Sequence, residues 1–257
     1  MTVSIGSCIF RGVKRVFALL VVGASFWWGT QPLHALFIID SFDTTQYISV
    51  SGTPSGYKTN FSSVVALDVV GQSRDVFIER TTSNAGSVAF DASASTNGFA
   101  SFAQGLNTAG RALVVWDGPD TTTNIIYNGL GKVDVTQGGT NQWLFTKFGS
   151  DLGNVSIKFT FYTDSTNFSF TTVNVPSNSL INLASVHVPL GNFSVGGGSG
   201  ADFTKIGAVS MLIDGTTKND ADLIIDAVEL VWVPEPSSAV LGMLGAWALA
   251  LVRRRRR

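Results

Sequence analysis

Val155-Ser156-Ile157-Lys158-Phe159-Thr160-Phe161-Tyr162 is the stretch that decides the fold of this chain. Apolar side chains occupy every second position, and Ser, Lys, Thr and Tyr occupy the positions between them. Successive side chains of a strand point to opposite faces of a sheet, so a period of two predicts an antiparallel strand with one buried and one wet face. The polar stretch 164–167 and the run Phe168–Val175 then predict its hairpin partner.

Short strand-like runs separated by turn signals extend on both sides of this hairpin, including turns at 71–75 and 117–119. The glycine-rich stretch 196–200 is expected to be a flexible loop. No internal segment reads as an amphipathic helix, so more than ten short strands predict an all-β fold, an antiparallel β-sandwich of jelly-roll type. The further strands are expected at Phe37–Ile39, Val64–Val70, Val76–Arg80, Ser87–Asp91, Phe99–Ala103, Ala112–Trp116, Gly131–Val135, Gln142–Phe148, Val186–Val188, Ile206–Ile213 and Leu223–Trp232.

The charge of the central span excludes one class of partner. Residues 36–233 hold nine basic and seventeen acidic side chains, a formal net charge of −8, although the whole chain carries −1. A negative surface repels phosphate backbones, so we expect no nucleic-acid binding. The length of the span suits one β-sandwich domain.

The first 35 residues predict export. Three basic residues between positions 11 and 15 precede an apolar stretch from Val16 to Trp28, and small residues follow. This order is typical of the helix of a secretory signal peptide. We place the cleavage after Ala35, with a nearby site or a retained anchor as the alternatives.

The last residues form a second topogenic segment. Pro234-Glu235-Pro236 precedes an apolar run from Ala239 to Val252, which as a helix would rise about 21 Å at ~1.5 Å per residue. That is short of a hydrocarbon core of about 30 Å, so we expect a stop-transfer transmembrane helix in a thinned bilayer. The positive-inside rule places the terminal cluster in the cytoplasm. The cluster consists of Arg253, Arg254, Arg255, Arg256 and Arg257.

This tripartite end resembles the PEP-CTERM sorting signal of Gram-negative bacteria, which joins a Pro-Glu-Pro motif, a short apolar helix and terminal arginines. The resemblance implies recognition and cleavage by exosortase, a membrane-embedded cysteine protease. It also implies release or re-anchoring outside the cell. The expected domains are a signal peptide at 1–35, a β-sandwich at 36–233 and a sorting signal at 234–257. An ordinary tail anchor is the alternative.

The two ends of the central span carry a second resemblance. The segments Ala201–Val209 and Asp222–Leu230, with the opening Ile39-Asp40-Ser41-Phe42-Asp43, are similar to the last and first strands of carbohydrate-binding-module-like jelly rolls. Such modules commonly hold a structural calcium ion between their first and last strands. The resemblance therefore implies Asp40, Asp43 and Asp226 as calcium ligands.

Asp226 is also notable on its own, because it shares a predicted strand face with apolar residues. An unpaired carboxylate there would cost several kcal/mol, so it must be paired, hydrogen-bonded or bound to a cation. The alternative to calcium is an aspartate at a turn or strand end that reaches solvent or backbone amides. No other cofactor is expected.

Catalytic groups are scarce in the central span. His187 is its only histidine, in a strand-like position, and Cys8 is the only cysteine of the chain and precedes the apolar stretch of the signal peptide. One histidine without cysteine cannot build a zinc, iron or haem site. The glutamates Glu79 and Glu229 lie 150 residues apart, without the paired spacing of jelly-roll glycosidases. We therefore expect no enzyme, with a glycoside-active enzyme as a remote alternative.

Two functions remain for an exported, non-catalytic sandwich. The first is a structural protein of the cell envelope or the extracellular polysaccharide matrix, anchored to the membrane as a precursor and later at the cell surface or outside the cell. The second is a discrete glycan-binding module that stacks sugars on exposed aromatic side chains. The aromatic candidates are Trp116, Trp143, Tyr127 and Tyr162, each of which could equally be a core residue.

Overall fold

The computed structural model describes residues 36–52, 58–82, 85–93, 98–120, 122, 124–153, 155–177, 180 and 182–232. They belong to the compact unit Ala35–Arg257, and the other unit, Met1–His34, lies outside the described residues. The elements are β1 (Phe37–Asp40), β2 (Gln46–Val50), β3 (Lys58–Val65), a 3-10 turn (Val70–Gln72), β4 (Ser73–Arg80), β5 (Val88–Ser93), β6 (Phe99–Gln104), β7 (Gly110–Trp116), β8 (Trp143–Ser150), β9 (Val155–Tyr162), β10 (Phe168–Val175), β11 (Ala184–Pro189), a 3-10 turn (Leu190–Asn192), β12 (Ser194–Gly197), β13 (Ala208–Asp214), β14 (Asp222–Ile225) and β15 (Val228–Val231).

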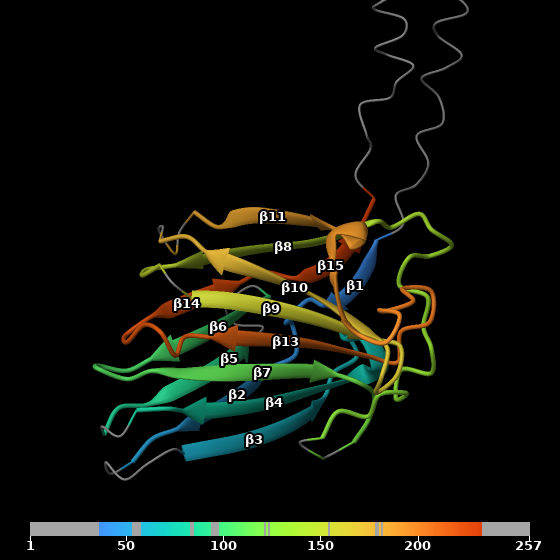
Figure 1. The fold of residues 1–257 in the computed structure, drawn as a ribbon. Helices are drawn as coiled ribbons and strands as arrows, with labels where there is room; N and C mark the ends of the chain where they lie inside the picture. The colour runs from blue at the N-terminus through green and yellow to red at the C-terminus, as the bar shows by residue number, and fades with distance from the viewer. Residues whose placement is uncertain are drawn as a thin grey trace, which may run out of the picture. The chain divides into compact units, whose positions relative to one another are not determined.

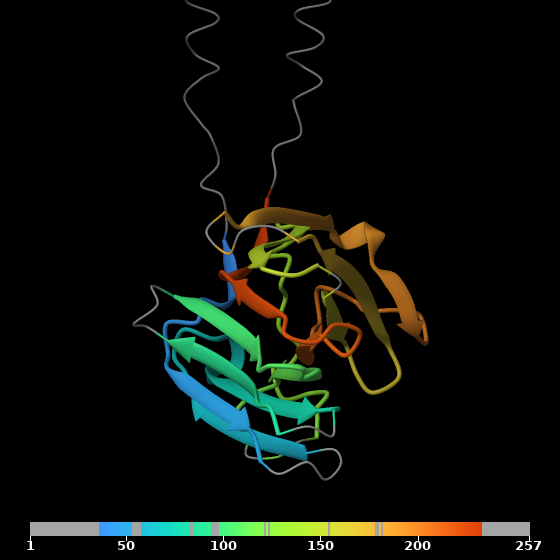
Figure 2. The same ribbon diagram turned by 90° about the vertical axis from the view of Figure 1, so that its left-hand side faces the viewer.

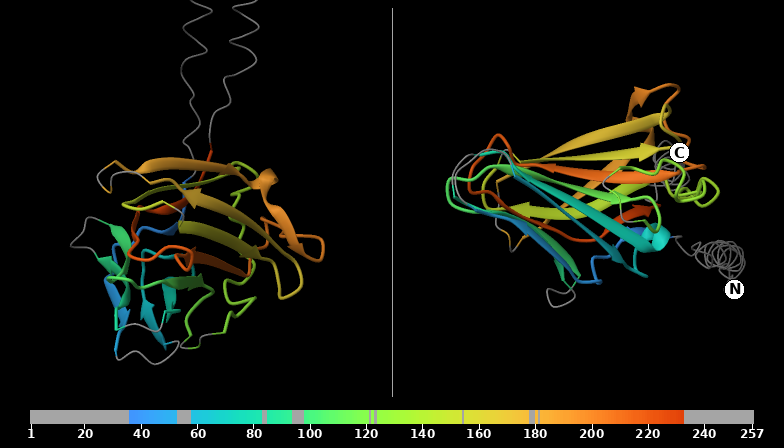
Figure 3. Two further views of the ribbon diagram at one scale, coloured as in Figure 1. Left: turned by 60° about the vertical axis from the view of Figure 1, so that its left-hand side comes forward. Right: turned by 90° about the horizontal axis from the view of Figure 1, so that it is seen from below.

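The strands form two antiparallel sheets packed face to face. The seven-stranded sheet has the order β12-β10-β9-β13-β7-β4-β3 and faces the viewer in Figure 1. The eight-stranded sheet has the order β1-β15-β8-β14-β6-β5-β2, and β11 also pairs with β8. Figures 2 and 3 show the two layers from the side and from below. The predicted all-β antiparallel sandwich is therefore confirmed.

The hairpin that led the sequence argument is present. β9 and β10 pair in unbroken register from Phe168 opposite Tyr162 to Val175 opposite Val155. The apolar set of β9 is fully buried between the sheets, whereas Lys158 and Tyr162 lie half-exposed on the outer face. Asp164 closes the turn by accepting hydrogen bonds from the backbone and side chains of Thr166 and Asn167.

Several predicted strand boundaries were wrong. The expected strand Val64–Val70 is instead the end of β3 followed by a bend, and Lys58–Val65 pairs along its whole length with β4. β2 was not predicted, and neither was β12, whose Ser194–Gly197 overlaps the expected glycine-rich loop. Residues 131–135 form a single bridge, Val133 to Ile206, in place of a strand.

The expected strand Leu223–Trp232 is broken by a bulge at Asp226–Ala227. Ile225 lies opposite Phe148 of β8, and Glu229 lies opposite Phe145, so this side has one residue more than β8 between the two pairs. The extra residue shifts the alternation of faces, which leaves Ile225 and Val228 both buried. Asp226 is therefore not on the apolar face.

A buried ion pair joins the two sheets. Arg74 of β4 contacts both carboxylate oxygens of Asp40 of β1 at 3.0 Å, and both side chains are 0 % exposed. The indole Nε1 of Trp116 donates to Asp40 Oδ2 at 2.8 Å, and the Phe42 backbone N–H donates to Asp40 Oδ1 at 2.8 Å. Burial raises the pKa of Asp40 to about 6, against the lowering effects of Arg74 and these donors.

The remaining donors of Arg74 are also used. Its Nε donates to Gln46 Oε1 at 2.8 Å, and its NH2 group donates to the Thr44 carbonyl. Gln46 in turn donates to the Ser62 carbonyl of β3 at 3.0 Å. One network thus links β1 and β2 of one sheet to β3, β4 and β7 of the other. Figure 1 places the strands that contribute these side chains.

The signal helix, the motif Pro234-Glu235-Pro236 and the arginines that follow lie outside the described residues. Among the residues that are described, no helix is long and apolar enough to span a bilayer.

The Arg74–Asp40 pair generates a stability prediction. Replacing Arg74→Met should lower the free energy of unfolding by about 3–5 kcal/mol, because it leaves a buried carboxylate without its counter-ion. Lys205→Met is the matched control, since Lys205 and Asp202 form an ion pair whose side chains are 60 % and 44 % exposed. Such surface pairs contribute about 0–1 kcal/mol. Urea unfolding of the full chain measures both, and equal losses would contradict a structural role for the buried pair.

Candidate functional site

The outer face of the seven-stranded sheet carries an apolar strip. Residues directly opposite each other in an antiparallel sheet share a face, so the register places one side chain from each of five neighbouring strands in a single row. All five are partly exposed, because their neighbours along each strand, such as Val76 and Ile157, fill the core. We call this row the outer strip: Phe61, Phe77, Leu113, Leu212 and Lys158.

A depression opens at the β3–β4 end of the outer strip. Two partly exposed phenylalanine rings and two aliphatic side chains supply its apolar lining, and a hydroxyl, an amide and a carboxylate lie beside them. Ligand sites commonly combine an apolar lining with a few polar groups that fix orientation. The lining residues are Phe61, Phe77, Leu113, Val115, Thr122, Asn124 and Asp75.

The loop after β7 supplies the polar side of this depression. It folds back on itself so closely that a Cβ on Gly129 would lie 1.5 Å from the Asp117 carbonyl oxygen, so only glycine fits there. Asp117 Oδ2 accepts a hydrogen bond from the Ile126 backbone N–H at 2.6 Å. The loop is fastened to the sheet by Leu130 N–H, which donates to the Gly207 carbonyl at 2.9 Å.

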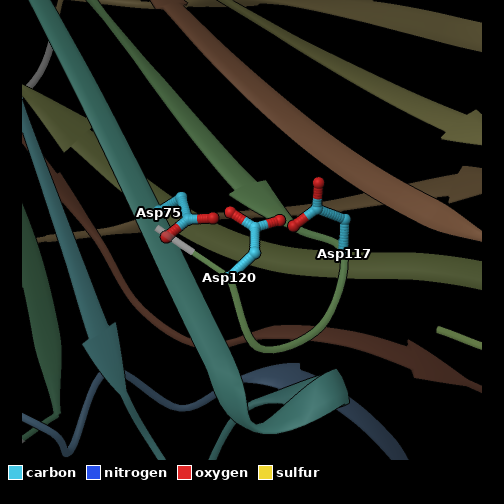
Figure 4. A group of neighbouring side chains, drawn as sticks. All are labelled: Asp75, Asp117 and Asp120. Carbon is cyan, nitrogen blue, oxygen red and sulfur yellow. The ribbon is translucent and has the colours of Figure 1, made fainter. Parts of the chain in front are cut away.

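Three carboxylates meet beneath this loop. Asp75 is the third residue of β4, Asp117 follows β7 and Asp120 lies three residues further on, and Figure 4 shows their side chains next to one another. Each residue offers one oxygen, and these three oxygens lie within 4.8 Å of one another. Burial, with repulsion from the neighbouring carboxylates, raises the pKa of Asp75 to about 6 and that of Asp117 to about 6.

A second aromatic group lies on the same outer face, toward β9 and β10. Tyr162 packs edge-on against Tyr127 of the loop, with ring centroids 5.2 Å apart, and its ring lies 5.4 Å from that of Phe168. Lys158 Nζ lies 4.2 Å from the centroid of Phe170. The structure therefore brings two of the sequence-predicted aromatics, Tyr127 and Tyr162, to the face that carries the depression.

Trp116 does not belong to this surface. Its side chain is 0 % exposed, and its indole N–H is bonded to Asp40 in the core. The prediction that Trp116 contacts a glycan was wrong, because its position in β7 turns the side chain toward the opposite sheet.

Trp143 lies on the outer face of the eight-stranded sheet, on the other side of the molecule. It is half-buried and lies in register with Pro189 and Val231. On the same face, the exposed His187 packs on Phe145 with ring centroids 4.7 Å apart. Trp143 thus remains a stacking candidate, on a different surface from the depression.

The three predicted calcium ligands lie apart. Asp40 is in the core and bound to Arg74, whereas Asp43 is exposed and accepts a hydrogen bond from Ser41 Oγ at 2.8 Å. Asp226 sits on the bulge and contacts Lys147 Nζ at 3.3 Å. Within the described parts of the chain, the acidic group close enough to share an ion is the trio at 75, 117 and 120. The predicted calcium site therefore needs correction: these three aspartates do not form one ligand set.

Sequence reasoning missed the residues that line the depression. Phe77 alternates with the apolar Val76 and Ile78, and this period of two could have placed it on the wet face. Phe61 carried no such signal, because the strand predicted in this region began only at Val64. Asp75 and Asp117 were assigned to turns, and only the β4–β7 pairing brings them together.

No family model matches the sequence. No curated protein matches it either. Among solved structures, the chain is similar to the family 11 carbohydrate-binding module from Clostridium thermocellum in complex with a β-1,3-1,4-mixed-linked tetrasaccharide. The identity is 12 %, the match covers 80 % of this chain and 99 % of that one, and the TM-score is 0.39.

Two further structures show a weaker or more partial likeness. TmCBM61, in complex with β-1,4-galactotriose, is 8 % identical, with 71 % of this chain and 92 % of that chain covered and a TM-score of 0.30. An exo-β-agarase is 8 % identical over 77 % of this chain but 25 % of its own length, with a TM-score of 0.37. These likenesses concern a coarse two-sheet arrangement and assign no binding residue to this chain.

Proposed function

We propose that this chain is an exported, non-catalytic protein whose β-sandwich binds glycan on the outer face of its seven-stranded sheet. The observation that carries the proposal is the depression with Phe61 and Phe77 beside Thr122, Asn124 and Asp75. A pyranose ring presents an apolar face of C–H groups and an edge of hydroxyls. Aromatic rings next to amide, hydroxyl and carboxylate groups complement both parts.

The layout of the face favours a chain of several sugars over a single one. The depression lies at β3 and β4, whereas Tyr162 and Phe168 lie at β9 and β10, three or more strands away. Strands are spaced by about 4.8 Å, so the two aromatic groups are at least ~14 Å apart across the sheet. An extended oligosaccharide can touch both groups, and a monosaccharide reaches one.

The three neighbouring carboxylates raise the alternative of a glycoside-active enzyme. Hydrolysis uses two carboxylates that flank an accessible bond. Here Asp117 is 2 % exposed and Asp75 is 4 % exposed, so a glycosidic bond cannot lie between them. This arrangement supports binding rather than hydrolysis, and a release assay for reducing ends on the bound glycans checks it.

Export and processing rest on the two end segments of the sequence. The basic and apolar N-terminus and the Pro-Glu-Pro motif with its apolar run and arginines support secretion and exosortase cleavage, with the membrane as a transient partner. An exported glycan-binding sandwich fits a role at the cell surface or in an exopolysaccharide matrix. The sequence also predicted a second role, that of a structural protein of the matrix. A protein in that role would have no saturable glycan-binding site, whereas the proposed binding module has one.

Glycan binding is predicted to depend on the two phenylalanines of the depression. Phe61→Ala or Phe77→Ala should weaken oligosaccharide binding by about tenfold or more, because each removes a stacking surface worth roughly 1–2 kcal/mol. Calorimetry of the full chain, after a glycan array selects the ligand, measures the change.

Trp143→Ala is the matched control, since Trp143 is a half-buried aromatic on the opposite outer face. It should leave binding unchanged. Loss of binding in Trp143→Ala with retention in Phe61→Ala would move the site to the eight-stranded sheet. If no glycan on the array binds saturably, the result would contradict glycan recognition and favour the structural matrix role.

Processing is predicted to remove both ends. Mass spectrometry of the extracellular or envelope fraction should find neither the first residues nor the terminal arginines. Glu235→Ala should retain the C-terminal segment because the motif is lost, whereas Ser238→Ala, just outside the motif, should be processed normally. A cytosolic chain that runs from Met1 to Arg257 would contradict export.

A further inference from the structure

The trio of Asp75, Asp117 and Asp120 has three buried oxygens that lack any partner. Among the described residues, no hydrogen-bond donor reaches Asp75 Oδ1, Asp117 Oδ1 or Asp120 Oδ2. Asp75 and Asp117 are 96 % and 98 % buried, since they are 4 % and 2 % exposed. Buried polar atoms in native proteins are almost always satisfied, so three orphaned oxygens in one place indicate a missing partner.

The other oxygen of two of these carboxylates does have a hydrogen-bond donor. Asp117 Oδ2 accepts from the Ile126 N–H at 2.6 Å, and Asp120 Oδ1 accepts from the Thr122 N–H at 2.7 Å. The loop thus fixes Asp117 and Asp120 by one oxygen each and leaves the other oxygen of each carboxylate without a donor. Figure 4 shows the three carboxylates side by side, with Asp120 between the other two.

Among the described residues, no basic side chain forms an ion pair with the trio. The described ion pairs join Arg74 to Asp40, Arg111 to Glu79, Lys147 to Asp226 and Lys205 to Asp202, and none includes a member of the trio. Like charges at such distances repel strongly in a water-poor site. A cation with oxygen ligands would supply both the missing charge and the missing partners.

We propose that Asp75, Asp117 and Asp120 bind a calcium ion. Calcium takes oxygen ligands at about 2.3–2.6 Å, so two ligands of one ion lie at most ~4.8–5.2 Å apart. Each of the three carboxylates offers one oxygen that lies within 4.8 Å of the other two, which meets this limit. Magnesium demands near-ideal octahedral geometry and usually keeps several water ligands, and zinc prefers nitrogen and sulfur ligands, whereas calcium accepts an irregular set of carboxylate oxygens.

A calcium ion at the trio would hold the loop after β7 in place beside the depression. Asp75 belongs to β4, whereas Asp117 and Asp120 belong to the segment that leads to Thr122 and Asn124. Binding one ion by all three fastens this segment over the sheet next to Phe61 and Phe77. This consequence rests on the proposed glycan site, but the ion site itself does not, since its ligands are defined without the glycan.

Thermal melting of the full chain without any glycan tests the site. After chelation, calcium at about 10 mM should raise the melting temperature by roughly 5–10 °C if this is about a hundredfold above the dissociation constant, a range usual for extracellular modules. Magnesium at the same concentration should raise it by much less. No calcium response would overturn the proposal.

Substitutions assign the response to residues. Asp75→Asn and Asp120→Asn should each abolish it, and both should fold at least as stably as the unsubstituted chain in chelator, because they relieve repulsion. Asp202→Asn is the matched control, an exposed turn aspartate whose carboxylate is satisfied by Thr204 and Lys205. Asp226→Asn tests the ligand set expected from the sequence.

Retention of the full response in Asp75→Asn and Asp120→Asn, or its loss in Asp226→Asn, would refute the site at the trio. Glycan calorimetry on the same samples separates the two proposals. A calcium response without glycan binding contradicts only the proposed function. Glycan binding that is unaffected by chelation, in a chain without a calcium response, contradicts only the ion site.

Discussion

The bidentate contact between Arg74 and Asp40 is the constraint on which the sandwich depends. A guanidinium and a carboxylate without solvent exposure are tolerated only if nearly every donor and acceptor is used, and here Trp116, Phe42, Thr44 and Gln46 complete the set. A hydrophobic core alone holds two sheets together without fixing how one slides over the other. A network with fixed hydrogen-bond geometry permits one alignment, so it sets the relative position of β1 and β4.

That alignment has consequences for the outer surface. Trp116 and Asp117 are consecutive, so fixing the indole against Asp40 also fixes the direction in which the chain leaves β7. The same holds for Arg74 and Asp75, whose side chains point to opposite faces of β4. The buried pair and the carboxylate trio thus depend on the same two segments, the start of β4 and the end of β7, so the alignment that fixes Arg74 and Trp116 also positions Asp75 and Asp117.

The fold class and the central hairpin were predictable because they depend on local periodicity. The alternation in Val155–Tyr162 survives in the structure residue by residue. Local pattern fails where the pairing partner decides the structure: β12 is a strand because it lies against β10, although its sequence is glycine-rich. The bulge at Asp226 has the same origin, since only the register against β8 reveals the additional residue. The site was less predictable, because Phe61, Phe77 and the trio are brought together by pairing between strands distant in sequence.

The first and last described strands are neighbours, with Phe37 opposite Leu230 in the β1–β15 ladder. The two ends of the sandwich therefore leave it about one strand spacing, ~5 Å, apart. A domain with adjacent ends can be inserted into a surface loop of another protein without stretching that loop. A sandwich of this topology can therefore be inserted as a domain into a host chain. Because β1 and β15 belong to the eight-stranded sheet, the outer face of the seven-stranded sheet would stay exposed.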